Sequence, residues 1–509
     1  MKHSWINLVS CLFCYLFCLC FQVEGQGPVQ DNPSYQVQQV EMPAGLVSQT
    51  GGLDFFPDGR MVACFMRGEV MIYNPHTGTW AVFAEGLQSP LGVVAVNNAE
   101  VLVMQLTELT RITDTDGDGH ADLFVSETDE FGVSGNYHEF NYGPARDSAG
   151  NLFFSLNTGS SGGGIRSEVR GQLNKLGREG DDGHKEMFSV TPYRGWIMKL
   201  TTEGKLHPYA SGFRSPNGLG FDLKGNLFVT DNQSDWVETS SLYHVEEGRF
   251  YGHVASLVWK KGWETTDPFN LPIQQLEKIR THAAVLFPQG IIANSPSQPL
   301  ADATAGKFGP FAGQLFIGEM NRDRIVRVML ENVGGQLQGA CIPFIDGRGL
   351  HKGNNRLAFA PDGSLWVGQT NYGGWAGDSG MQKIVFSGVV PMDVATMKLT
   401  RTGFDLTFTQ PVDSVLAADP KNYKIRHYKY EYKKKSLDEG IDISTQVDVQ
   451  EVPITKITVS NDHKSVSINL EKLRAGYVYE CKLDKIANPA GRVLDNTLIC
   501  YTLNQLIPN

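Results

Sequence analysis

The chain contains few cysteines, few charged residues and no long apolar run beyond its first 21 positions. Of its eight cysteines, four lie within the first 20 residues, and no C-x-x-C-H motif occurs, so the sequence has no attachment site for covalent haem. Only 19% of the 509 residues are charged and the formal net charge is −11, so we expect no nucleic-acid partner. Cys481 and Cys500 lie 19 positions apart in two expected strands, so an exported chain could join them by a disulfide.

The N-terminus has the composition of a secretory signal peptide. A cationic start at residues 1–3 is followed by an apolar run over residues 6–21 and a polar stretch over residues 22–25. This order is typical of cleaved leaders, and the apolar run is short for a membrane-spanning helix. We therefore expect residues 1–25 to be removed, no transmembrane segment to remain, and the mature protein to be secreted or periplasmic.

One pattern recurs six times along the next 350 or so residues: an alternating apolar run, a tight turn and a second alternating run. These hairpin patterns lie at 52–64, 92–104, 140–156, 218–231, 308–319 and 356–369. A third apolar run follows each of them. Six such units predict an all-β fold, a six-bladed β-propeller over residues 40–388. Long insertions at 157–192 and 254–286 are expected on the face that carries functional loops.

The pattern changes after Pro391. Short alternating runs such as 404–408 and 466–470 are separated by turns, and no helical periodicity is evident. Residues 395–506 therefore predict a small immunoglobulin-like β-sandwich. It contains no catalytic constellation, and we expect a structural or docking module.

An acidic stretch within the second unit has the spacing of a calcium loop. Asp114, Asp116, Asp118 and Asp122 occupy positions 1, 3, 5 and 9, with glycine at position 6. Hard oxygen ligands favour Ca²⁺ over metals that prefer softer ligands. Position 12 is Val125 rather than a bidentate glutamate, so a surface turn without metal stays open as an alternative. The predicted role of the ion is structural.

Two charged side chains stand just before predicted hairpins. His138 precedes the third hairpin, and Arg214 precedes the fourth in the stretch Ser-Gly-Phe-Arg-Ser-Pro-Asn-Gly. Because equivalent positions of successive blades surround the central axis, we expect both side chains near one channel mouth. A histidine suits general base catalysis near neutral pH, and an arginine can bind a carbonyl or carboxylate group. Taken singly, either residue could instead stabilise its loop.

The phrases HEFNYGPARDSAGNLFFSL and GFRSPNGLGFDLKGNLFVTDNQSD resemble the soluble quinoprotein glucose/sorbosone dehydrogenases. The resemblance covers roughly residues 45–388 and implies a six-bladed propeller that uses pyrroloquinoline quinone and Ca²⁺. It implies that His138 accepts the proton of the substrate hydroxyl and that Arg214 contacts the quinone carbonyl. Asn217 falls on a quinone-contacting position of the same motif.

The same resemblance assigns further positions and shows departures at several of them. The loop whose backbone carbonyls hold the catalytic calcium contains Asn232, Gln233 and Ser234, where Gln233-Ser234 replaces a Gly-Pro pair. The positions assigned to the cofactor besides Asn217 are Asn232, Gln233, Asn321, Arg322 and Arg356. Where the family has a lysine facing the cofactor carboxylates, this sequence has Asn321 beside Arg322. Where the family has a later pair of arginines, this sequence has Arg356. A tricarboxylate cofactor therefore meets fewer cationic partners than the family offers.

Three functions follow from these patterns. The leading hypothesis is a secreted oxidoreductase that oxidises a sugar or polyol and passes electrons to a separate acceptor. The second is a calcium-dependent lactonase-type hydrolase, whose polar cage would be formed by Asn232, Asp235, Asn294, Glu319 and Asn355. The third is a non-catalytic carbohydrate- or partner-binding propeller, in which sugar rings would stack on Trp236, Trp259, Trp366 and Trp375.

Overall fold

The structure is a computed structural model. It describes residues 32–160, 162–166, 169–178, 187–233, 235–372, 377–433 and 445–508. The expected signal peptide, the expected calcium position Ser234 and the tryptophan Trp375 lie outside these residues. Among the described segments, no helix has the length and apolar character needed to span a bilayer.

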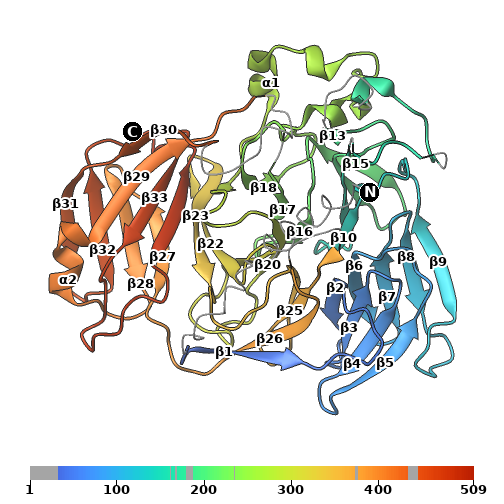
Figure 1. The fold of residues 1–509 in the computed structure, drawn as a ribbon, viewed down its shortest axis with the longest axis horizontal. Helices are drawn as coiled ribbons and strands as arrows, with labels where there is room; N and C mark the ends of the chain where they lie inside the picture. The colour runs from blue at the N-terminus through green and yellow to red at the C-terminus, as the bar shows by residue number, and fades with distance from the viewer. Residues whose placement is uncertain are drawn as a thin grey trace, which may run out of the picture. The chain divides into compact units, whose positions relative to one another are not determined.

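Most of the described chain forms four-stranded antiparallel sheets (Figure 1). The first sheet holds β2 (Thr50–Phe55), β3 (Met61–Phe65), β4 (Val70–Asn74) and β5 (Thr79–Ala84). The second holds β6 (Gly92–Asn97), β7 (Glu100–Met104), β8 (Leu109–Thr113) and β9 (Leu123–Thr128). The third holds β10 (Asn141–Arg146), β11 (Leu152–Leu156), β14 (Trp196–Leu200) and β15 (Leu206–Ser211). The fourth holds β16 (Gly218–Phe221), β17 (Leu227–Asp231), β18 (Ser240–Val245) and β19 (Val285–Phe287).

Two further groups of four strands complete the propeller. One consists of β20 (Pro296–Ala301), β21 (Leu315–Glu319), β22 (Ile325–Val333) and β23 (Gln336–Phe344). The other consists of β24 (Asn354–Phe359), β25 (Leu365–Gln369), β26 (Gly380–Phe386) and β1 (Tyr35–Val40). The strand β1 pairs antiparallel with β26, from Tyr35 opposite Phe386 to Val40 opposite Met381. The first described strand therefore closes the last sheet.

The innermost strands of the six groups form a closed cycle. In order around the axis, β2, β6, β10, β16, β20 and β24 each contact the next, and β24 contacts β2. The hydrophobic clusters lie between neighbouring sheets, for example Val62 and Cys64 of the first sheet with Val93 and Val101 of the second. The expected all-β propeller is thereby confirmed.

Glycine starts several innermost strands because the strands meet there at very short range. A Cβ atom on Gly92 would lie 1.6 Å from the carbonyl oxygen of Gly143, and one on Gly52 would lie 2.6 Å from the nitrogen of Val93. No side chain fits at such distances. The glycines that begin the predicted hairpins, in the dipeptides Gly-Leu and Gly-Val, therefore lie close to the axis of the propeller.

The fifth predicted hairpin, 308–319, is wrong in its first half. Only β21 is a strand there, and its partner is β20, which begins at Pro296. Pro296 and Pro299 both lie within β20, and the register shifts between them. Because proline lacks an N–H group, it is uncommon within strands. The two prolines therefore make residues 296–301 look unlike a strand in the sequence.

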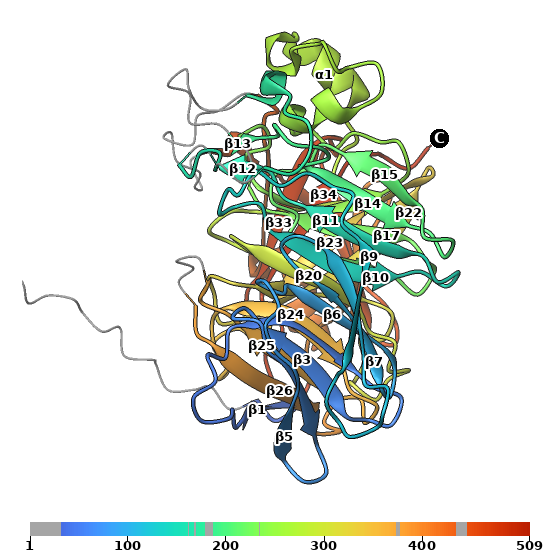
Figure 2. The same ribbon diagram turned by 90° about the vertical axis from the view of Figure 1, so that its right-hand side faces the viewer.

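Both insertions contribute to one face of the propeller, which we call the mouth: the face where innermost strands begin and second strands end. The elements of the first insertion are β12 (Gly159–Ser160), η1 (Lys175–Gly177) and β13 (Met187–Phe188). Those of the second are η2 (Val254–Trp259), η3 (Pro268–Asn270) and α1 (Ile273–Ile279). The helix η2 contacts η1, η3 and β13. Figure 2 shows α1, β12 and β13 of the two insertions at the same end of the molecule. Ser256 of η2 accepts a hydrogen bond from the backbone N–H of Gly212, next to the mouth end of β15.

The C-terminal residues form a β-sandwich that shares a sheet with the propeller. One layer holds β27 (Val394–Leu399), β28 (Gly403–Phe408), β31 (Ile454–Val459) and β32 (Ser465–Leu470). The other holds β29 (Tyr423–Lys429), β30 (Val447–Glu451), β33 (Tyr477–Leu483) and β34 (Leu498–Leu503), and β34 pairs with β23 of the propeller. The short helices α2 (Ser414–Ala418) and η5 (Pro420–Asn422) precede β29. The immunoglobulin-like topology stays a prediction.

The disulfide that the sequence left possible between Cys481 and Cys500 is absent. In the pairing of β33 with β34, Cys500 lies opposite Glu480, whereas Cys481 lies opposite Ile499. Neighbouring side chains of a strand point to opposite faces, so the two sulfurs lie on different sides of the sheet. Both cysteines are buried free thiols.

Candidate functional site at the propeller mouth

The topology places the candidate residues of the third, fourth and fifth sheets at the mouth. His138 and Arg214 precede the innermost strands β10 and β16, and Asn232 directly follows the second strand β17. Asn321 and Arg322 follow the second strand β21. The acidic loop between β8 and β9 is different, because β8 begins at the mouth and ends away from it. The predicted cofactor site and the predicted acidic calcium loop therefore lie on opposite faces.

His138 is held as a neutral imidazole with one basic nitrogen. Its Nδ1 lies 2.9 Å from the carbonyl oxygen of Thr158. A carbonyl only accepts hydrogen bonds, so Nδ1 carries the hydrogen and Nε2 is unprotonated. Burial, and then the positive charge of Arg214, lower the pKa of His138 to about 4. The imidazole is therefore a free base at neutral pH.

Arg214 belongs to the next blade and is tied to the same threonine. Its carbonyl oxygen accepts hydrogen bonds from the backbone N–H of Thr158 at 3.0 Å and from the Thr158 hydroxyl at 2.7 Å. The side chain is 15% exposed, and its Nε lies 3.5 Å from Oδ1 of Asp235. Among the described residues this Nε has no hydrogen-bond partner. Thr158, which sequence reasoning did not identify, thus links the imidazole of His138 to the backbone of Arg214.

Asp235 connects Arg214 to a second histidine. Its Oδ2 accepts the backbone N–H of Met187 at 3.0 Å and lies 3.3 Å from Nε2 of His253. Burial opposes ionisation of this carboxyl group, but His253 and Arg214 outweigh it, so the pKa of Asp235 is lowered. His253 precedes η2 in the second insertion. Sequence reasoning missed it because the path of a long insertion cannot be inferred from strand patterns.

Arg356 crosses the axis beneath the mouth. Its guanidinium donates to the carbonyl oxygens of Gly51 at 2.9 Å, Asn217 at 3.0 Å and Leu91 at 3.2 Å. It also lies 4.7 Å from the ring centre of Tyr142, and burial lowers its pKa to about 10. A cavity of only about 30 Å³ remains beside it, room for roughly one water molecule. Arg356 therefore closes the channel and ties four blades to its own.

The remaining predicted cofactor positions differ in how far their polar atoms are satisfied. Asn217 donates to the sulfur of Met320 at 3.0 Å, and Asn232 donates to the Ser295 hydroxyl at 2.8 Å. The amide oxygens of both asparagines are buried without a partner among the described residues. Gln233 accepts a hydrogen bond from Ser240 at 3.3 Å.

Arg322, which follows β21, has one N–H group without a hydrogen-bond partner among the described residues. Arg322 donates from Nη2 to the carbonyl oxygen of Gly290 at 2.7 Å, and no described group bonds its buried Nε. The neighbouring Asn321 is partly buried. Arg322 is therefore a second guanidinium at the mouth with an unused N–H.

The alternative calcium cage is only partly assembled. Oε1 of Glu319 accepts the backbone N–H groups of Asn294 at 3.0 Å and Ser295 at 2.9 Å. Asn355 donates to the carbonyl oxygen of Thr50, at the far side of the axis from Asn232. These side chains stabilise separate blade junctions.

Exposed aromatic rings flank the base. Tyr137 is 56% exposed, and its ring centre lies 6.1 Å from that of His138. Tyr372, from the loop after β25, is 36% exposed and packs edge-on against Phe140, which in turn contacts His138. By contrast, Trp236 and Trp366 are buried. The tyrosines, not these tryptophans, are the aromatic surfaces open to a ligand here.

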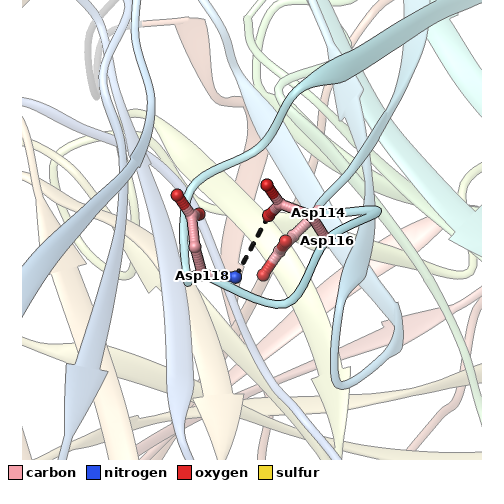
Figure 3. A group of neighbouring side chains, drawn as sticks. All are labelled: Asp114, Asp116 and Asp118. Carbon is pink, nitrogen blue, oxygen red and sulfur yellow. Dashed lines mark hydrogen bonds between the residues drawn. The ribbon is translucent and has the colours of Figure 1, made fainter.

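The acidic loop gathers carboxylates, but its own backbone already engages them (Figure 3). Ligand atoms of Asp114, Asp116 and Asp118 lie within 4.8 Å of one another. Both oxygens of Asp114 accept loop N–H groups, from Gly117 at 2.7 Å and Gly119 at 2.9 Å. Asp122 is bound to Thr115 instead and is not part of the group. The calcium assignment of this loop stays a prediction.

Comparisons with known proteins give one family match. The model of a family described as a domain of unknown function, DUF7133, matches residues 77–369, which reach from the first sheet to β25 and exclude the sandwich. Among curated proteins, none matches the chain.

Two solved structures illustrate the structural similarity. The soluble aldose sugar dehydrogenase of Escherichia coli in its apo-form is 14% identical over 69% of this chain and 99% of that chain, with a TM-score of 0.47. The PQQ-bound aldose sugar dehydrogenase of Streptomyces coelicolor is 15% identical over 70% of this chain and 99% of that chain, with a TM-score of 0.43. At these TM-scores, the two similarities carry no argument about activity.

Proposed function

The chain belongs to the DUF7133 family, a domain of unknown function, and we propose from the geometry of its mouth that it is an oxidoreductase acting on a hydroxyl group of a sugar or polyol. The observation that carries this proposal is the shared anchoring of His138 and Arg214 on Thr158. It supports the proposal because Thr158 links the imidazole of His138 to the backbone of Arg214, a residue of the next blade whose positive charge acts on that imidazole.

The base is prepared for removing a proton from a hydroxyl group. Thr158 fixes the tautomer of His138, so Nε2 is the atom that accepts the substrate proton. Burial of the ring, and then the nearby charge of Arg214, keep the imidazole unprotonated before reaction. After proton transfer the imidazolium lies in the field of Asp235, whose charge favours the protonated state.

Pyrroloquinoline quinone fits the reacting end of this site. Arg214 and Arg322 each keep a buried Nε that has no hydrogen-bond partner among the described residues, although Nε of Arg214 lies 3.5 Å from Oδ1 of Asp235. Such donors suit a quinone oxygen or a carboxylate. Arg214, Arg322 and Asn321 would hold the cofactor, while Arg356 supports the floor because its donors already bind carbonyl groups. When bound, the quinone would supply the two-electron acceptor, and electrons would then pass to a separate acceptor.

Calcium is the second cofactor in this proposal. The loop Asn232–Gln233–Ser234 would hold it through oxygen atoms, and the unpartnered amide oxygen of Asn232 lies in that loop. The substrate would bind above, where Tyr137 and Tyr372 offer ring faces to the apolar side of a sugar.

Reconstitution tests the proposal. Purified protein is loaded with pyrroloquinoline quinone and Ca²⁺ and assayed for dye reduction with a panel of aldoses and polyols. We expect turnover that requires both additions and that His138→Gln abolishes, whereas His207→Gln, at an exposed position on β15, leaves it unchanged. Hydrolysis of sugar lactones with Ca²⁺ alone would select the hydrolase, and glycan binding without any product would select the binding protein.

A further inference from the structure

A fully buried ion pair joins Glu139, in the loop that carries His138, to Arg194, just before β14. The side chains of Arg194 and Glu139 are 0% and 1% exposed, and Nε of Arg194 lies 3.7 Å from Oε2 of Glu139. Burial lowers the pKa of Arg194, while Glu139 counteracts this effect. Isolating two charges from water is expensive unless further hydrogen bonds satisfy both groups, so the bonds of this pair decide what it does.

The guanidinium of Arg194 holds both ends of residues 132–141, which we call the base loop. It donates from Nε to the carbonyl oxygen of Gly132 at 2.8 Å. From Nη1 it donates to the carbonyl oxygen of Glu139 at 3.1 Å and to Oδ1 of Asn141 at 2.7 Å. One side chain thus connects the start of the base loop to the residue after His138 and to the first residue of β10.

The carboxylate of Glu139 organises the middle of the same loop. Its two oxygens accept the backbone N–H and the hydroxyl of Ser134, both at 2.7 Å. Asn136, which follows shortly after, accepts the backbone N–H of His138 at 3.0 Å. The base loop is therefore held by the carboxylate of Glu139, which belongs to the loop, and by the guanidinium of Arg194, which lies outside it.

We propose that Arg194 and Glu139 are positioning residues that set the direction of the His138 imidazole. Neither residue touches a reacting atom; they act by holding the backbone of Gly132, Ser134 and Glu139 in the base loop, so that Nδ1 meets Thr158 and Nε2 faces the substrate. This inference rests on the proposed function. The pair is chosen over ordinary packing because three of its bonds end on the backbone on either side of the base, at Gly132, Ser134 and Glu139.

Two substitutions separate charge from shape. Glu139→Gln keeps an acceptor for Ser134 but removes the negative charge, and Arg194→Lys keeps the positive charge but loses the fork that spans the loop. Arg170→Gln is the matched control: Arg170 packs on Phe131 at 4.9 Å, the same ring that Arg194 meets at 5.8 Å. The side chain of Arg170 bonds Phe131 and Thr107 and no carbonyl of the base loop.

The readouts are steady-state kinetics and the histidine side-chain ¹⁵N signals of the holoenzyme. In Glu139→Gln and Arg194→Lys we expect kcat to fall about 100-fold with KM within about threefold, because a displacement of about 1 Å costs that much in rate. The His138 signals should change from one tautomer to a mixture, and its apparent pKa should rise as water reaches the ring. Arg170→Gln should show none of these changes.

The outcomes keep the two proposals apart. Folded Glu139→Gln and Arg194→Lys proteins with a single His138 tautomer and unchanged kcat would overturn the positioning role. If the wild-type protein turns over no substrate, the oxidoreductase proposal fails, while the ¹⁵N signals still decide whether the pair fixes the imidazole. If Arg194→Lys does not fold, Glu139→Gln carries the test.

Discussion

The mouth and the acidic loop both have sequence signatures of binding sites, but the polar side chains of the two regions differ in how many of their polar atoms have hydrogen-bond partners. At the mouth, Arg214 and Arg322 are held in place but keep N–H groups that no described residue bonds. In the acidic loop, Asp114, Asp116 and Asp118 are more exposed, and their oxygens accept hydrogen bonds from loop N–H groups. Buried N–H groups without a hydrogen-bond partner suit a ligand, whereas the carboxylates of the acidic loop already accept hydrogen bonds from the N–H groups of their own turn.

The largest expected effect concerns the base of the mouth. His138→Gln removes the basic nitrogen but keeps a side chain that can donate to Thr158. We expect kcat to fall about 10³-fold, within the range for loss of a general base, with the fold retained. The measurement is dye reduction by the reconstituted enzyme together with circular dichroism. A variant that keeps more than about a tenth of the activity would mean that another group takes the proton.

Stability should respond most strongly at the floor of the mouth. Arg356→Met removes a guanidinium that bonds carbonyl groups of Gly51, Leu91 and Asn217, and these oxygens would then be buried without donors. We expect a loss of about 3–5 kcal/mol in the free energy of unfolding. Denaturant melts provide the measurement.

The control for the floor is an arginine outside the mouth. Arg60→Met removes a partly exposed ion pair with Asp58 at 2.8 Å, and we expect a change below about 1 kcal/mol. Equal losses of unfolding free energy in the two variants would show that the bonds of Arg356 between blades contribute no more than a partly exposed ion pair.

Much of the propeller could be predicted from the sequence because each hairpin repeats local information: alternation, a turn and a glycine at the axis. β20 could not, since Pro296 and Pro299 break that local signal while the sheet still accepts the strand. Blade equivalence predicted that His138 and Arg214 both precede innermost strands at the mouth. Thr158, His253 and Arg194 could not be found, because their partners are brought to them by insertions and buried loops, which carry no periodic pattern.

A smaller effect, with a defined sign, comes from pH. The pKa of His138 is about 4 in the folded protein and 6.5 in the reference state, so the unfolded chain binds this proton first as pH falls. The histidine therefore contributes stability that is present above pH 6.5 and is lost between pH 6.5 and 4, roughly 3 kcal/mol in full.

A neighbouring carboxyl group opposes this trend, so a difference measurement is needed. Burial raises the pKa of Asp231 from 3.8 to about 6. That contribution is present below pH 3.8 and is lost as pH rises to about 6. We therefore expect the unfolding free energy of the wild type, relative to His138→Gln, to fall as pH drops from 6.5 to 4. A constant difference across this window would place His138 in contact with solvent. The control is His207→Gln, which should track the wild type.

The smallest effect is expected at the acidic loop. If this loop binds Ca²⁺, millimolar Ca²⁺ should raise Tm by a few degrees, and Asp116→Asn should remove part of that shift by deleting one ligand charge. Activity should change less than about twofold, because the loop between β8 and β9 lies on the face opposite the mouth. Thermal melts with EDTA or Ca²⁺ test the expected shift in Tm, and the dye assay tests the expected small change in activity. A large loss of turnover in Asp116→Asn would contradict the separation of the two regions, since only a coupling through the second sheet could then connect them.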